Sequence, residues 1–532
     1  MKPRLFWSAL LLIALIGLIL RVYVGAKTFL SFDEWQHVFM AASPRWVDLS
    51  YELRTNAHPP LFFLLLRQIL RLGNPALYRS ISIAAGAGSI VVVGLIARKV
   101  LSSPVLQLLC AAAFALSTDA ISISDEIRSY QLCVFFVLLA FNAWLESEAS
   151  VESKTRPEVE IRAWIAFAIF SSLAVGTHYF AAFFLGACVV VTLPRLRRMK
   201  RGSCWIACLS LAFPCAVFAL AYVLHAGAQP MQGYLFDFYR SGTPGESVTS
   251  FLLRNSRNFF NLFSPAEIHN SAIFLPVLLL LVAAGICAFR RPLRVQAGAA
   301  VALAAVIVVE LLAASLVNRY PFGGMLRHQY IAGPFLIVAV FVILDALIPL
   351  ANPYLQRVIP AVILVICILN VAVGGPKLIL YPGVVLATQE FNSWHSAFPD
   401  AHAIYLDHWS VEAYFIHTST RPRQFVRRIP DDAVIDEFHI PDGTPEGTDI
   451  FYDKTRILAD VLDPSVYRSL AACLRVSGAK ELDLFYMEPG DKSIELSPAE
   501  LERVSRYAAE QGMTVTRVDA HPKSLSAGFR LR

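Results

Sequence analysis

Long apolar runs constrain this chain more than any other feature of its sequence. They recur along residues 1–378, separated by short polar or basic stretches. A helix needs about 20 apolar residues to cross a bilayer, so the runs predict an α-helical polytopic membrane protein with about eleven transmembrane helices. The expected spans are 5–22, 77–97, 104–120, 131–145, 163–178, 179–194, 203–225, 271–289, 295–317, 331–348 and 358–378.

The composition agrees with a membrane protein. Hydrophobic residues make up 56% of the 532 residues and charged residues 16%, whereas soluble domains average about 45–50% and about 25%. The net charge of +6 comes from basic clusters between apolar runs, which is typical of membrane proteins and does not indicate nucleic-acid binding. The nine cysteines show no metal-ligand spacing, and Cys473 stands alone in the C-terminal region, so no disulfide framework is available there.

The first apolar run has two interpretations. The basic start and the small residues Gly25 and Ala26 fit a cleaved signal peptide. We favour a retained first span, because the run is long for a signal sequence and a polar motif follows it at once.

The basic clusters orient the helices. If 163–178 and 179–194 are two helices, all short basic loops fall on one side, which the positive-inside rule makes cytoplasmic. One long tilted helix over 163–194 would reverse everything downstream. The clusters are Lys2 and Arg4, Arg98 and Lys99, residues 195–201 and residues 290–294.

Five polar groups then fall on the opposite side, on alternate loops. Each alone is consistent with a solvated loop or an interfacial anchor, but together they predict a cavity at the membrane surface. They are Asp33-Glu34, His58-Pro59-Pro60, the stretch 124–132 with Asp125, Glu126, Arg128 and Tyr130, Thr177-His178-Tyr179, and Arg319-Tyr320 with residues 327–330. The segment 58–75 is apolar but carries Arg67 and Arg71 on one helix face, which predicts a helix lying on the membrane surface.

These residue types suit particular chemistry. Two adjacent carboxylates, Asp33 and Glu34, can provide a general base. Arginines such as Arg128 and Arg327 present a planar donor fork that matches phosphate, and Tyr130 can donate one further hydrogen bond.

Residues 379–532 differ in kind, because their charged fraction rises and their apolar runs shorten. We expect a separate soluble α/β domain here, after a membrane domain over 1–378. Its expected strands are 403–406, 413–416, 449–452 and 482–486. A capping box from Ser497 to Glu500 predicts a helix that ends at Gly512.

The order of these motifs resembles that of the GT-C membrane glycosyltransferases, specifically family 39 and its bacterial relatives. These include protein O-mannosyltransferases, the lipid A aminoarabinose transferase and mannosyltransferase-like proteins. The resemblance covers about residues 1–345. It is carried by Asp33-Glu34, His58-Pro59-Pro60-Leu61, Leu77-Tyr78-Arg79-Ser80, residues 126–130, Thr177-His178-Tyr179, and residues 327–330 followed by Pro334.

The resemblance implies an inverting glycosyltransferase of the GT-C fold. It would move a hexose or pentose from a polyprenyl-phosphate sugar to an extracytoplasmic glycan, lipid or protein. The site would face away from the cytoplasm in the plasma (inner) membrane, with the C-terminal domain on the same side. No cofactor is required, although a divalent metal could bind through Asp33 with Asp125 or Glu126. The implied roles are catalysis for Asp33 and Glu34, and donor phosphate binding for Arg128, Tyr130, Arg327, His178 and His58.

Three alternatives stay open. A transporter or flippase of lipid-linked sugars would show internal repeats and charge near the bilayer midplane, where only Glu310 and Asp345 are candidates. A ligase or polymerase of lipid-linked glycans would use the same lipid compartment. A non-catalytic scaffold would only present residues 379–532.

Overall fold

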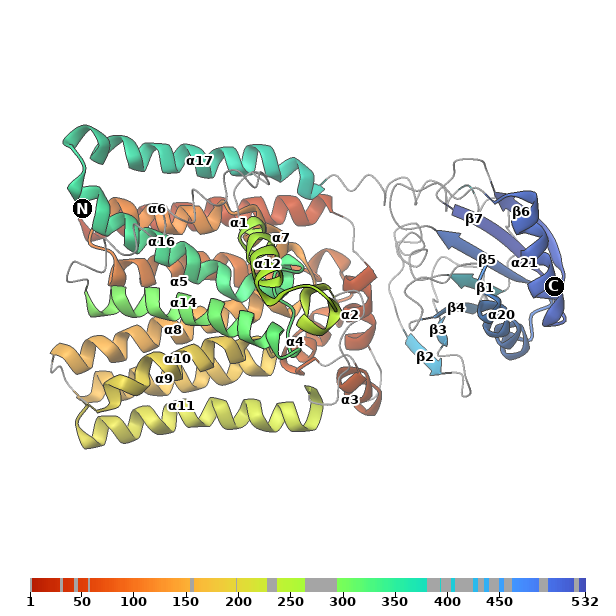
Figure 1. Ribbon diagram of the computed structural model, residues 1–532, viewed down its shortest axis with the longest axis horizontal. Helices are drawn as coiled ribbons and strands as arrows, with labels where there is room; N and C mark the ends of the chain where they lie inside the picture. The colour runs from red at the N-terminus through yellow and green to blue at the C-terminus, as the bar shows by residue number, and fades with distance from the viewer. Residues whose placement is uncertain are drawn as a thin grey trace. The chain divides into compact units, whose positions relative to one another are not determined.

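The computed structural model contains a helical bundle and a smaller α/β unit (Figure 1). It describes residues 2–28, 32–42, 46–55, 58–153, 157–197, 199–226, 237–263, 294–379, 393, 403–406, 424–428, 435–439, 449–453, 462–487, 496–520 and 526–532.

The bundle is built from long apolar helices, as the sequence predicts. Within the described residues, eight spans are long and apolar enough to cross a membrane, and the bent pair α6 and α7 would make a ninth. The chain is therefore a polytopic membrane protein. Seven of the spans are formed by the long helices α1 (Pro3–Lys27), α5 (Ser80–Val100), α8 (Ser129–Ser153), α9 (Pro157–Thr177), α11 (Arg201–Ala221), α14 (Val295–Leu316) and α17 (Pro353–Ile379). The eighth is Leu326–Leu350, whose central helix is α16 (Gly333–Leu347).

Shorter elements connect and extend these helices. They are α2 (Phe32–Ala42), α3 (Trp46–Thr55), α4 (Leu61–Leu70), η1 (Pro75–Leu77), α6 (Pro104–Ala115), α7 (Thr118–Asp125), α10 (Ala181–Leu196), η2 (Tyr222–Ala226), η4 (Arg240–Gly242), α12 (Val248–Leu262), α15 (Leu326–Gln329), η6 (Tyr330–Ala332) and η7 (Ile348–Leu350).

Most predicted spans coincide with described helices, and the differences have local causes. The expected span 271–289 lies outside the described residues. Residues 163–178 and 179–194 fall on two helices, α9 and α10, although α10 has only 16 residues. The count of eleven spans stays a prediction.

The predicted span 104–120 is interrupted. Its first half, α6, ends at Ala115, and Ser117 has an extended backbone and accepts a hydrogen bond from the Ala120 amide at 3.3 Å. This side-chain cap starts α7 as a new helix, which is bent by 48° from α6.

Aromatic side chains pack between the helices of the bundle. Phe335 of α16 packs on Phe141 of α8 and Phe184 of α10, with ring centroids 5.1 and 5.8 Å apart. Helix α8 also packs against α5 and α9 (Figure 1). Because lipid tails are as apolar as these side chains, close packing rather than water exclusion holds such helices together.

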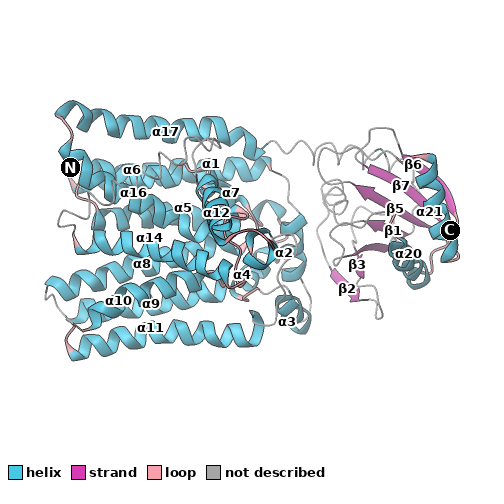
Figure 2. Ribbon diagram, in the orientation of Figure 1, coloured by secondary structure: helices cyan, strands magenta, loops and turns pink. Residues whose placement is uncertain are grey.

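The α/β unit contains a seven-stranded mixed sheet (Figure 2). The strand order is β2-β3-β4-β1-β5-β7-β6, with β1 parallel to β4 and β5 and the remaining pairs antiparallel. The strands are β1 (Ala403–Leu406), β2 (Gln424–Arg428), β3 (Ile435–His439), β4 (Asp449–Asp453), β5 (Leu482–Met487), β6 (Val515–Ala520) and β7 (Ser526–Leu531).

Two helices, α20 (Pro464–Ser477) and α21 (Pro498–Glu510), pack on one face of this sheet. Tyr405, Leu484 and Phe529 are neighbours in register and belong to the same buried core as the two helices. The predicted capping box of α21 is present, and β1, β4 and β5 match predicted strands. The expected strand 413–416 lies outside the described residues.

The contacts divide the chain into two compact units. The first comprises Met1–Lys27, Glu52–Leu65 and Arg79–Ile379, and the second comprises Thr28–Tyr51, Leu66–Tyr78 and Leu380–Arg532. The boundary between 378 and 379 stays a prediction.

Candidate functional site

A cluster of rings surrounds His178, which lies in the turn between α9 and α10. The His178 ring centroid is 4.4 Å from that of Phe180, 4.7 Å from Tyr130 and 6.3 Å from His58. The structure thus brings three of the predicted site residues together from separate segments of the first unit.

Three basic side chains act on the same imidazole. The Arg128 guanidinium lies 5.9 Å from the Tyr130 ring centroid. Burial lowers the pKa of His178 well below its ordinary value, and the charges of His58, His328 and Arg128 lower it further. The cluster therefore concentrates positive charge around a neutral His178.

The hydrogen bonding of His178 agrees with a neutral ring. The Phe180 amide donates to Nδ1 at 3.1 Å. Nδ1 must therefore be the acceptor nitrogen, and the proton of the neutral ring is carried by Nε2. In this tautomer His178 can donate one hydrogen bond to an anion without being charged.

Arg128 lies in the connection between α7 and α8, which is tied to α5, and Tyr130 lies in the first turn of α8. The Arg128 amide donates to the Glu126 carbonyl at 2.8 Å, and the Ser82 hydroxyl donates to the Arg128 carbonyl at 3.2 Å. Both Arg128 and Tyr130 are buried. Their positions are therefore set by backbone contacts in addition to the ring packing.

Asp125 has a partner that the sequence analysis missed. Arg79 forms an ion pair with Asp125 at 3.5 Å and donates to the Gly25 carbonyl at 2.8 Å. A Cβ at residue 25 would lie 2.6 Å from Asp125 Oδ1, so glycine is required for this close approach. The signal that could have indicated the pair is Arg79 at the start of an apolar run.

Asp33 and Glu34 occupy the first turn of α2, in the second unit, and are not in a loop. Glu34 is buried and Asp33 is half-buried. One turn later, His37 Nδ1 lies 2.8 Å from the Asp33 carbonyl oxygen, so Nδ1 is the donor. Negative side chains at a helix N-terminus are favoured by the helix dipole. The catalytic roles of both carboxylates stay predictions.

The fifth polar group lies around α15, with Arg319 and Tyr320 before this helix and Tyr330 directly after it. The Tyr320 hydroxyl donates to the His328 carbonyl at 3.0 Å, and Gln329 Nε2 donates to the Pro321 carbonyl at 2.8 Å. His328 is buried and its charge acts on His178. Arg327 precedes it and is half-buried, and its role in phosphate binding stays a prediction.

The described residues offer little support for the predicted metal site of Asp33 with Asp125 or Glu126. Within the residues that the structure describes, no three His, Cys, Asp or Glu side chains are grouped as metal ligands would be. The charge of Asp125 is already balanced by Arg79. A divalent metal bound by Asp33 with Asp125 or Glu126 stays a prediction of the sequence.

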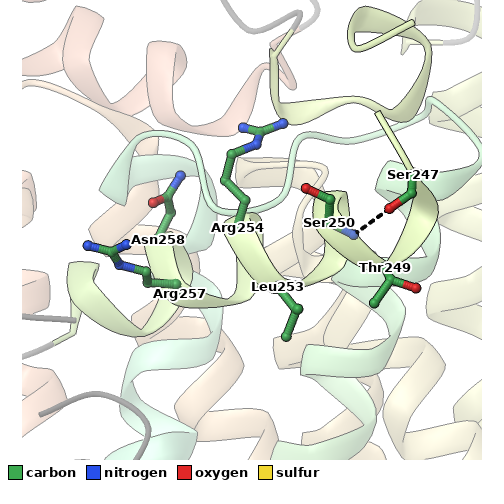
Figure 3. Close-up of a pocket in the computed structure, with 7 residues that line it drawn as sticks. All are labelled: Ser247, Thr249, Ser250, Leu253, Arg254, Arg257 and Asn258. Carbon is green, nitrogen blue, oxygen red and sulfur yellow. Dashed lines mark hydrogen bonds between the residues drawn. The ribbon is translucent and has the colours of Figure 1, made fainter. Parts of the chain in front are cut away.

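A shallow pocket lies along α12 (Figure 3). Its volume is about 530 Å³, and α12 with its N-cap Ser247 supplies the lining. Arg254 forms an ion pair with Glu246 at 3.0 Å. The hydrogen bond from Arg254 lowers the pKa of Glu246 to about 2. The lining consists of Ser247, Thr249, Ser250, Leu253, Arg254, Arg257 and Asn258.

Comparison with solved structures relates the bundle to known folds. The chain is similar to ArnT from Cupriavidus metallidurans in the apo state, with 12% identity, a TM-score of 0.55 and coverage of 98% of this chain and 97% of that chain. ArnT bound to undecaprenyl phosphate matches with 13% identity, a TM-score of 0.50 and the same coverage.

The S. cerevisiae protein O-mannosyltransferase Pmt1-Pmt2 complex bound to the sugar donor matches with 15% identity and a TM-score of 0.35. That match covers 47% of this chain, and the chain spans 38% of that relative. No family model and no curated protein matches the chain. The likeness in structure shows that the chain has the GT-C fold.

Proposed function

We propose that this GT-C-fold chain transfers a sugar from a polyprenyl-phosphate sugar to an acceptor outside the cytoplasm, with inversion at the anomeric carbon. The observation that carries the proposal is the cluster in which His58, Arg128, Tyr130 and His178 meet. Such a group is suited to an anion held at a membrane surface. ArnT, whose fold is similar, has been solved with undecaprenyl phosphate.

In this proposal the cluster binds the phosphate of the donor. The Arg128 fork and the Tyr130 hydroxyl donate to phosphate oxygens, and His178 donates through Nε2. As the glycosidic bond breaks, negative charge grows on the departing lipid phosphate, and donors fixed in advance stabilise that charge. Arg327 supplies further positive charge, and the imidazole of His58 supplies a further phosphate contact.

Asp33 is the proposed general base. Its carboxylate takes the proton of the acceptor hydroxyl while the hydroxyl oxygen attacks the anomeric carbon from the side opposite the phosphate. The new glycosidic bond forms as the old one breaks, and the lipid phosphate leaves with the bonding electrons. A phosphate leaving group needs no proton from a second carboxylic acid, so Glu34 orients the acceptor or shares the role of base.

The experiment compares sugar transfer in membranes that carry wild type, Asp33→Asn or Asp345→Asn, with a panel of radiolabelled polyprenyl-phosphate sugars. Asp345 accepts hydrogen bonds from the Ser102 and Ser103 amides, between α5 and α6, so its variant is a control remote from the cluster. We expect Asp33→Asn to lower transfer by about 100-fold to 10,000-fold with unchanged expression. Full turnover by Asp33→Asn would refute the base assignment. Label that crosses the bilayer without transfer would instead favour a flippase.

A further inference from the structure

Arg21 is a buried cation inside the apolar helix α1. Its side chain is 0% exposed. Nε donates to Ser124 Oγ at 3.0 Å, and Nη1 donates to the carbonyl oxygens of Gly17 at 3.0 Å and Ala115 at 3.1 Å. Within the described residues, Nη2 has no hydrogen-bond partner. Charge inside a membrane helix costs free energy, so packing alone does not account for an arginine here.

Ser124 links Arg21 to a buried polar network. Ser124 Oγ accepts the hydrogen bond from Arg21, and its own hydroxyl proton is within reach of the Ala120 carbonyl and, at 3.2 Å, of Gln131 Oε1. Gln131 Nε2 donates to Ser89 Oγ at 3.0 Å, and the Tyr330 hydroxyl donates to Gln131 Oε1 at 2.8 Å. The network therefore joins α1, α5, α7, α8 and η6.

The network holds both ends of one segment. Ser124 and Gln131 bound the residues 124–131, which carry Arg128 and Tyr130 between them. Both end residues are 0% exposed, so their hydrogen bonds do not compete with water. Hydrogen bonds are stronger in a buried, low-dielectric interior than in water, so those of Ser124 and Gln131 favour a single arrangement of the segment between them.

Gly86 of α5 lies directly against the contact between Arg21 and Ser124. A Cβ at Gly86 of α5 would lie 2.8 Å from Arg21 Nε and 2.9 Å from Ser124 Cβ. Glycine at residue 86 therefore lets α5 approach the point where α1 and α7 meet through Arg21 and Ser124.

We propose that Arg21 is a positioning residue that fixes residues 124–131, so that Arg128 and Tyr130 are aligned for a phosphate. The effect of Arg21 on the position of residues 124–131 does not depend on what the protein does. The consequence for donor use rests on the proposed function. Arg21 acts through Ser124 and touches no reacting atom in this proposal.

The first test needs no reaction. Amide hydrogen exchange is measured on the full chain in detergent for wild type, Arg21→Gln and Ser124→Ala. Arg98→Gln is the matched control, since Arg98 also packs on α1 but contacts the Phe6 and Trp7 rings instead.

We expect peptides over 124–131 to exchange about tenfold faster in both test variants and not in the control, because opening of this segment becomes easier. Unchanged exchange in the test variants would overturn the inference. If Arg21→Gln fails to fold, Ser124→Ala decides.

The second test asks whether Arg21 acts through the segment it holds. Donor KM and kcat are measured for Arg21→Gln, Arg128→Ala and the double variant. We expect Arg21→Gln to weaken donor use about tenfold alone and less than about twofold when Arg128 is already absent, because coupled residues are not additive. Equal losses in both backgrounds would contradict the inference. If wild type transfers no sugar but exchange over 124–131 still rises in the variants, the proposed function fails and the positioning role stands.

Discussion

The protonation state of His178 sets the charge of the ring cluster. The Phe180 amide fixes Nδ1 as an acceptor, and burial with nearby cations lowers the pKa of the imidazole. The unfolded chain would bind a proton here at about pH 6.5, whereas the folded chain binds it only at lower pH. Stability from this group is therefore present above about pH 6.5 and is lost as the pH falls toward the folded-state pKa.

This difference predicts how acid affects stability. His178→Phe keeps a ring in the cluster and removes the titration, so we expect its melting temperature to fall less than that of wild type between pH 7 and pH 5, by about 2–4 °C. Tyr130→Phe is the control, because tyrosine does not titrate in this range. The measurement is thermal unfolding in detergent at both pH values. Equal acid sensitivity of His178→Phe and wild type would show that His178 is not held neutral.

Some residues of the candidate site could be predicted from the sequence, and others could not. The order of motifs sufficed to select His58, Arg128, Tyr130 and His178, which the fold brings into one region. It could not select Arg21, because an arginine near the end of an apolar run is equally expected to extend toward the membrane surface. Partners more than 90 positions apart, such as Ser124, leave no local pattern.

At the scale of elements, polar residues at helix N-termini mark helix starts that hydrophobic periodicity does not predict. The apolar run 104–120 reads as one helix, yet Ser117 caps a second helix and bends the path. The Asp33-Glu34 pair reads as a loop after the first span, yet it starts α2. In both cases a polar residue satisfies free amides or sits at a helix N-terminus, an effect that hydrophobicity does not record.

Gly323 fixes the packing of α12. Its φ is +75°, and a Cβ there would lie 3.0 Å from the Asn255 carbonyl carbon. We expect Gly323→Ala to destabilise the contact by about 2–3 kcal/mol, from backbone strain plus the clash. Gly245→Ala is the matched control, since Gly245 has a φ of +90° but no atoms within 4 Å, and should cost about 1 kcal/mol. Protease cleavage within α12, measured against temperature, would separate the two. Equal effects would mean that the close approach contributes nothing.

At the scale of the whole molecule, a buried ion pair joins two strands of the second unit. Arg530 of β7 donates to both oxygens of Asp483 on β5, at 2.7 and 2.8 Å, and the Asp483 side chain is 1% exposed. Arg530→Met would leave that carboxylate buried without its cation, so we expect a loss on the order of 3 kcal/mol. Arg503→Met breaks only the exposed pair with Glu500 and should cost less than about 0.5 kcal/mol. The urea dependence of protease resistance in this unit measures both. Equal midpoints for the two variants would contradict the prediction.

The number of crossings decides which face of the membrane carries the proposed site. Helix α10 has 16 residues, a length of about 24 Å, which is short for a bilayer of about 30 Å. If α10 crosses and α6 with α7 forms one broken span, five crossings separate the exposed Ser102 from the exposed Ser241, and the two lie on opposite sides.

In a chain without its own cysteines, Ser241→Cys should react with an impermeant thiol reagent applied to intact cells, and Ser102→Cys only after the membrane is permeabilised. Reaction of both from outside would mean that an even number of crossings separates them, because either α10 or the bent pair α6 and α7 does not cross. The proposed acceptor and the basic loops would then need to be reassigned together, because the positive-inside rule could no longer hold for every cluster.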